Sequence, residues 1–204
     1  NSDINAKLGT KRAITNSTWI PKKFEFSNMF SYGTNNVIDF SQMKGAYGIF
    51  APNASGKSTL WDALSFCIFD KCSRTSKADD VMNYSKMTFN CKFTFELNGV
   101  DYTIERTAKK SPKRGTVKVD VNFYRIVDGQ AESLNGEQRR ETNSIIREYV
   151  GTYDDFVLTA MSTQSNNSGF IEKSQKERKE LLAQFLDMDV FEDLYQIASE
   201  EIKE

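Results

Sequence analysis

The most constraining stretch of this sequence is a strict alternation of apolar and polar residues over 89–97. Such alternation is typical of a β-strand that buries one face and exposes the other. The dipeptide Asn98-Gly99 follows, and both residues tolerate the positive φ angles that a two-residue hairpin requires. The alternation returns over 100–104 and 117–123, and Asp128-Gly129 predicts a further turn. The sequence therefore predicts an antiparallel meander.

Other elements have weaker patterns. Two short strands are expected at 23–26 and 37–40, and the apolar run 45–51 predicts a buried strand. From Lys57 the apolar residues recur at spacings of three and four, which predicts an amphipathic helix. Helical spacing returns near Ile145. We also expect a helix over 172–186. Apolar residues over 191–202 recur at near-heptad spacing. This segment is a core-packing helix, the root of a coiled coil, or a docking site for a partner subunit.

The composition excludes several kinds of site. The chain has no histidine, which removes Ser-His-Asp and Cys-His triads and His-ligated zinc. Its three cysteines (Cys67, Cys72 and Cys91) form no CxxC pair, so we interpret them as reduced thiols of a cytoplasmic protein. No stretch approaches the roughly 18 apolar residues of a membrane span. A net charge of −1 gives no general argument for nucleic-acid binding.

The segment 51–59, Ala-Pro-Asn-Ala-Ser-Gly-Lys-Ser-Thr, approximates the phosphate-binding pattern GxxxxGK[ST]. A tight loop between a strand and a helix turns its backbone N–H groups inward, and the helix N-terminus adds partial positive charge. In this pattern Gly56 leaves room for the phosphates, and Lys57 reaches the β- and γ-phosphates. The Ser58 hydroxyl is placed to coordinate Mg²⁺.

The loop departs from the pattern, and parts of a complete ATPase are missing. Ala51 stands at the first glycine, and Ala54 stands where many such loops have a second one. Alanine fits there only with a negative φ, which we therefore expect. An apolar strand ending in an acid is also needed for hydrolysis, but Val119-Asp120 and Leu186-Asp187 do not fit, and no LSGGE-like signature occurs. We expect phosphate binding and no catalytic residue within this chain.

From about Lys23 onward the sequence resembles the N-terminal half of SbcC-type (Rad-fifty-like) DNA repair ATPases, which include an exonuclease subunit of large phages. The resemblance implies an α/β fold: the N-terminal lobe of a P-loop NTPase of the ABC and SMC-like type, with an antiparallel β subdomain and the start of a coiled coil. In this sequence Gln164 lies 107 residues after Lys57, and this spacing suits the SbcC family better than it suits transporter ATPases. The matching segments are 28–33, 37–40, 51–64, 162–165, 170–182 and 186–188.

The resemblance also implies roles for individual residues. Ser58 and the Q-loop residue Gln164 would approach Mg²⁺, and Ser31 would lie beside the nucleotide. Many family members have arginine just before that serine, where this chain has Phe30. The residues that would cradle the phosphates of ATP are Asn53, Ala54, Ser55, Gly56, Lys57, Ser58 and Thr59.

The family further implies a domain plan and partners. Residues 1–22 would be a leader, 23–187 the head lobe from P-loop to Q-loop, and 188–204 the root of the coiled coil. The C-terminal half of the same chain would complete the head, and two heads would pair around ATP. A separate SbcD-type metallonuclease subunit would cut DNA at double-stranded ends. The protein would act in the cytoplasm, or in the host cytoplasm if it is viral, and would have no membrane partner.

Three alternatives stay open. An SMC-type chromosome-organising ATPase would share these motifs and lack the nuclease. A small nucleotide kinase or GTPase would need an acidic residue that we do not find in this chain. The third concerns the role of the basic tract 109–114, which is either a solvated loop or a contact to DNA phosphates. Its basic residues are Lys109, Lys110, Lys113 and Arg114, and Arg106 and Lys118 flank it.

Overall fold

The structure is a computed structural model, and it describes residues 18–113 and 115–161, together with 174–176, 178–179, 182 and 199. The elements from β1 to α4 form one compact unit, and α5 belongs to a second. None of the described helices is both long and apolar enough to cross a membrane. The elements are β1 (Ile20–Ser27), β2 (Asn36–Asp39), η1 (Phe40–Gln42), α2 (Lys57–Phe69), α3 (Ala78–Val81), β3 (Thr88–Leu97), β4 (Val100–Lys110), β5 (Val117–Val127), β6 (Gln130–Ser133), α4 (Arg139–Val150) and α5 (Tyr153–Thr159).

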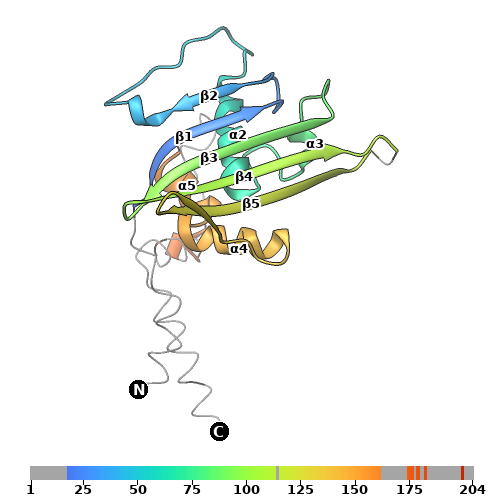
Figure 1. Ribbon diagram of the computed structural model, residues 1–204. Helices are drawn as coiled ribbons and strands as arrows, with labels where there is room; N and C mark the ends of the chain where they lie inside the picture. Colours follow the sequence, from blue (N-terminus) through green and yellow to red (C-terminus); the bar gives the residue numbers. More distant parts are fainter. Residues whose placement is uncertain are drawn as a thin grey trace. The chain divides into compact units, whose positions relative to one another are not determined.

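The strands of the first unit form one six-stranded sheet in the order β2-β1-β3-β4-β5-β6 (Figure 1). Every neighbouring pair is antiparallel. Asn98 and Gly99 have φ angles of 52° and 79°, and Asp128 and Gly129 have 51° and 77°. These left-handed pairs make the tight turns that join consecutive antiparallel strands. The predicted meander is confirmed.

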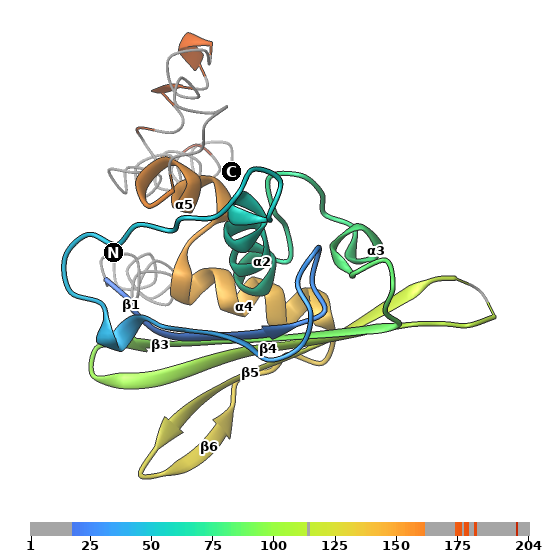
Figure 2. The same ribbon diagram turned by 90° about the horizontal axis from the view of Figure 1, so that it is seen from above.

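One face of the sheet carries the core, and α2, α3 and α4 all lie on that side (Figure 2). Because side chains alternate between faces, the aromatic residues of the strands converge on the helices. Burying each of them contributes about 1.5–3 kcal/mol. The buried phenylalanines of the strands are Phe24, Phe26, Phe89, Phe93, Phe95 and Phe123.

The opposite face of the sheet is polar and half-exposed. Lys22 bridges the carboxylates of Glu96 and Asp101, which face each other across β3 and β4, at 2.8 and 2.5 Å. Lys92 pairs with Glu105 at 3.1 Å. Ion pairs this exposed contribute about 0–1 kcal/mol each. The hydrophobic face therefore holds this unit together.

Three predictions of secondary structure need correction. Residues 45–51 form no strand, and Phe50 is 95% exposed, because no described strand pairs with this segment. The first strand, β1, begins at Ile20, three residues earlier than expected. The helix α2 is not amphipathic: residues 62–69 are all buried, since α2 contacts the sheet and also α4. Most of 172–186 and 191–202 lies outside the described residues.

Arg106 is a charged residue inside the core. It projects from β4 and is 1% exposed. Its Nε donates to the Cys67 carbonyl at 2.7 Å and its Nη2 to the Ile68 carbonyl at 3.2 Å. Burial lowers the pKa of its guanidinium, and the nearby Asp70 carboxylate opposes this effect. Arg106 therefore belongs to the core, and as a flanking residue it gives no support to a DNA contact of the tract 109–114.

Asp70 ends α2 in the left-handed conformation, with φ of 59°. Its carboxylate lies 3.8 Å from Nη1 of Arg106, forms an ion pair with Arg139, and accepts a hydrogen bond from Asn143 Nδ2 at 2.9 Å. These partners come from β4 and α4. The last turn of α2 is thus fastened to the sheet and to α4 at one point.

We expect Arg106→Met to lower the free energy of unfolding by about 3 kcal/mol, because it leaves two buried carbonyls and a carboxylate short of a partner. Urea unfolding followed by far-UV circular dichroism measures the change. Lys109→Met, an exposed position on the same strand, is the control, and we expect a change within about 0.5 kcal/mol. Equal unfolding midpoints for the two variants would contradict this role.

Candidate nucleotide-binding site

The segment 51–56 is an exposed loop that leads directly into α2. Gly56 is the N-cap of the helix, with φ of 96°, and no side chain of the described residues caps the first turn. The N–H groups of a helix's first turn have no partner within the helix, and together with the helix dipole they favour an anion. The loop and the start of α2 therefore form a surface suited to phosphate.

Only glycine fits at position 56. A Cβ atom there would lie 2.7 Å from Oγ of Ser31 and 3.1 Å from Oγ1 of Thr59. The positive φ adds strain for any residue with a side chain. The same distances show that Ser31 lies beside the loop, as the family resemblance implied.

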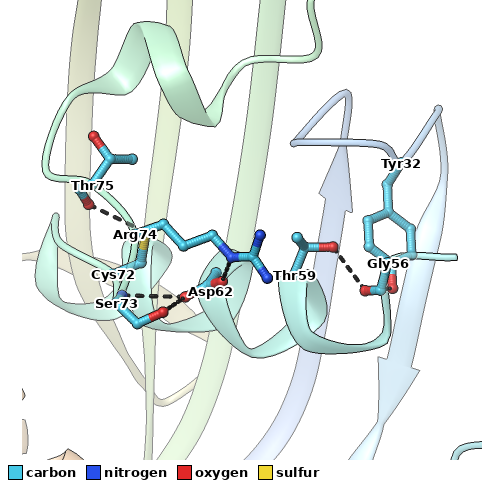
Figure 3. Close-up of polar contacts among 8 residues, drawn as sticks. All are labelled: Tyr32, Gly56, Thr59, Asp62, Cys72, Ser73, Arg74 and Thr75. Atoms are coloured by element: carbon cyan, nitrogen blue, oxygen red, sulfur yellow. Dashed lines mark hydrogen bonds and ion pairs between the residues drawn. The ribbon is translucent and has the colours of Figure 1, made fainter. Parts of the chain in front are cut away.

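The carbonyl oxygen of Gly56 accepts two side-chain hydrogen bonds (Figure 3). Oη of Tyr32 donates to it at 2.9 Å, and Oγ1 of Thr59 donates at 2.7 Å. Burial raises the pKa of Tyr32, which keeps the hydroxyl protonated as a donor. Sequence reasoning missed Tyr32, because the contact joins residues 24 positions apart. Tyr32 fixes the loop from the side of the sheet.

Tyr32 belongs to a turn that is itself held in place. Asn28 and Phe30 have positive φ angles of 59° and 49°. The Phe30 N–H donates to the Val81 carbonyl at 2.7 Å, and the Asn83 N–H donates to the Asn28 carbonyl at 2.9 Å. Asn83 Nδ2 also donates to the Tyr32 carbonyl at 3.2 Å. The segment that follows α3 therefore positions the turn carrying Ser31 and Tyr32.

Lys57 lies over the loop. Its Nζ donates to the carbonyls of Ala51 and Pro52 at 2.6 and 2.7 Å. These are neutral acceptors, and a phosphate oxygen is a stronger partner for an ammonium group. The residues present therefore fit a polyphosphate. Ser58 is exposed in the first turn of α2.

Ala54 differs from expectation. Its φ is 62°, in the left-handed region, whereas Ala51 keeps a negative φ. Left-handed backbone costs roughly 1–2 kcal/mol for a residue with a Cβ atom. The expectation of a negative φ at Ala54 is therefore wrong. The loop keeps the shape that a glycine usually makes, at the expense of local strain.

A family model of the AAA domain matches residues 23–204. The chain belongs to this family. Curated relatives include the uncharacterized protein R555 of Acanthamoeba polyphaga mimivirus, 38% identical over 91% of this chain. The SbcC subunit of the nuclease SbcCD of Bacillus subtilis is 26% identical over 85%, and the DNA double-strand break repair Rad50 ATPase of Methanococcus maripaludis is 28% identical over 85%. The chain spans 14–16% of the length of these relatives.

The resemblance to the N-terminal head region of SbcC-type ATPases is thereby confirmed. The structure of the recombination mediator protein RecF-ATPrS in the RecFOR pathway is similar, with a TM-score of 0.50 and 17% identity. The match covers 89% of this chain and 42% of that one. It confirms the α/β fold of the P-loop type. The start of a coiled coil falls outside the described residues.

The fold brings some of the predicted site residues together. Ser31 and Thr59 both lie beside Gly56, and Lys57 lies over the loop. Asn53, Ala54, Ser55 and Ser58 are exposed around them. Gln164 lies outside the described residues. The described residues contain no group of three or more acidic or cysteine side chains able to hold a metal. Contact of the predicted residues with a nucleotide stays a prediction.

We expect Ala54→Gly to raise the free energy of unfolding by about 0.5–1 kcal/mol, because glycine relieves the left-handed strain and loses only part of this gain to chain entropy. Ala51→Gly is the control, because Ala51 has a negative φ and no strain to relieve. We expect this variant to be less stable than the unaltered chain, since glycine only adds chain entropy to the unfolded state. Denaturant unfolding of both variants measures the difference. A less stable Ala54→Gly variant would contradict the strain.

Tyr32→Phe removes one hydrogen bond to the loop and leaves the ring in place. We expect a loss of about 1 kcal/mol of stability and faster amide exchange over 56–60. Tyr84→Phe is the matched control, since Tyr84 is 98% exposed and the change in stability should fall within about 0.5 kcal/mol. Hydrogen-exchange mass spectrometry of the two variants tests the contact, and identical exchange in both would refute it.

Proposed function

We propose that this chain is the ATP-binding N-terminal part of the head of an SMC-like DNA repair ATPase. The observation that carries the proposal is the left-handed Gly56 at the uncapped start of α2, packed so closely that no side chain fits, with Lys57 lying over the loop. Backbone donors, a helix dipole and one ammonium together suit a triphosphate. The relatives named SbcC and Rad50 support the repair setting.

Magnesium would bind through the Ser58 hydroxyl and the nucleotide phosphates, with Gln164 as a further ligand proposed from the family resemblance. The ion would neutralise charge on the β- and γ-phosphates. Ser58 supports this assignment because it is exposed in the turn that follows Lys57. An acid that polarises water would come from outside this chain, since its sequence contains no suitable strand end.

A downstream C-terminal half would complete the head. The exposed segment before the loop supports this proposal. Tyr47 and Ile49 are more than half exposed, and Phe50 is almost fully exposed. An apolar run without a strand neighbour gains stability when a second strand covers it. A head completed in this way would pair with a second head around ATP, and 188–204 would begin the connecting coiled coil.

We place a separate SbcD-type nuclease subunit and double-stranded DNA ends among the partners, since several relatives are named as part of the nuclease SbcCD. Lys110 pairs with Asp79 and Lys118 with Asp120, so Lys109 and Lys113 are the better candidates for a DNA phosphate contact. The free, buried thiols suit the cytoplasm. A chromosome-organising ATPase without a nuclease is the alternative.

Lys57→Ala tests the site directly. We expect the variant to lose about ten- to hundredfold in affinity for ATP, because a charge-assisted contact to phosphate disappears. Binding of a fluorescent ATP analogue in the presence of Mg²⁺ measures the dissociation constant. Lys44→Ala, an exposed lysine upstream of the loop, should bind as the unaltered chain does.

Circular dichroism of Lys57→Ala should match that of the unaltered chain, since among the described residues the lysine donates only to loop carbonyls. Equal affinities of the folded variant and the unaltered chain for ATP would remove the proposed function.

A further inference from the structure

A buried carboxylate on α2 has no assigned role in phosphate binding. Asp62 follows Thr59 by three residues, which is about one helical turn. It is only 4% exposed. Its Oδ1 accepts hydrogen bonds from the Ser73 N–H at 3.2 Å and the Ser73 hydroxyl at 2.6 Å, and its Oδ2 accepts one from Nε of Arg74 at 2.8 Å (Figure 3). Both carboxylate oxygens are thus used to hold one short segment.

That segment does not need Asp62 to close its turn. The Cys72 N–H donates to the Thr75 carbonyl at 3.0 Å, and the Cys72 thiol lies 3.2 Å from the same oxygen. Burying the Asp62 carboxylate costs free energy unless its oxygens accept hydrogen bonds, and Ser73 and Arg74 supply those bonds. The consequence is a fixed position for the guanidinium of Arg74.

Arg74 is bound on one side only. Its side chain is 55% exposed, and among the described residues neither Nη1 nor Nη2 has a hydrogen-bond acceptor. An arginine held through Nε presents its two terminal nitrogens as an open fork, and this fork matches two oxygens of a phosphate. Figure 3 shows the end of the guanidinium pointing from Asp62 toward Thr59, in the first turn of α2.

We propose that Arg74 is a second phosphate-binding residue of this site, whose terminal nitrogens bind oxygens of a nucleoside triphosphate held at the start of α2. This inference rests on the proposed function. Lys57 approaches the phosphates as a flexible point charge from the loop, whereas Arg74 offers a fork oriented in advance by Asp62. Orientation before binding reduces the side-chain entropy lost when the phosphate arrives.

Equilibrium binding of a fluorescent ATP analogue with Mg²⁺ tests the inference on the whole chain. We expect Arg74→Ala to weaken binding about ten- to hundredfold. Arg74→Lys keeps the charge without the fork, so its affinity should fall between those of the unaltered chain and Arg74→Ala. Arg140→Ala, an exposed arginine on α4, is the control and should bind unchanged.

Two comparisons separate the possible failures. Unchanged ATP binding by a folded Arg74→Ala, while Lys57→Ala loses it, would overturn the role of Arg74 and leave the proposed function intact. Unchanged binding by both variants would overturn the proposed function as well. If Arg74→Ala fails to fold, the affinities of Arg74→Lys and Asp62→Asn for the ATP analogue test the inference instead. It is overturned if both variants bind the analogue as tightly as the unaltered chain.

A short DNA duplex is the second probe, because its backbone offers the same phosphate oxygens. Affinity of Arg74→Ala for the duplex should equal that of the unaltered chain at the same salt concentration. Loss of duplex binding with ATP binding retained would assign the fork to DNA and overturn the inference.

Discussion

The buried guanidinium of Arg106 determines where α2 lies on the sheet. It donates to the last carbonyls of the helix, and Asp70 adds partners from α4 at the same point. A buried charge is tolerated only where its position is closely defined, because each donor needs a particular acceptor. With its C-terminal end fixed in this way, α2 presents its N-terminal end at a defined place. The candidate phosphate site depends on this arrangement.

The N-terminal end of α2 is shaped by residues from three separate segments. Tyr32 and Ser31 reach Gly56 from the turn after β1, and Asn83 holds that turn from the segment after α3. Arg74 lies between α2 and α3 and points its fork toward the same helical turn. A phosphate bound there would contact a loop whose position is set from several sides. Such pre-organisation lowers the cost of binding a highly charged ligand.

The candidate site is incomplete for ATP hydrolysis. The groups proposed to bind phosphate lie in the described residues, while the apolar segment before the loop is exposed and pairs with no described strand. The chain also spans only a small share of its SbcC and Rad50 relatives. Binding and hydrolysis are thus proposed to be separated along the protein, with binding in this chain and hydrolysis requiring residues outside it.

The local sequence determined the meander, its two glycine turns and the loop-helix junction, because alternation, positive-φ residues and the Gly-Lys-Ser order act over a few positions. Only the tertiary structure decided that 45–51 lacks a strand, since pairing depends on a neighbour elsewhere in the chain. It also decided that Arg106 is a core residue, that Tyr32 contacts the loop and that Asp62 holds Arg74. Contacts between distant segments depend on packing, and no local pattern encodes them.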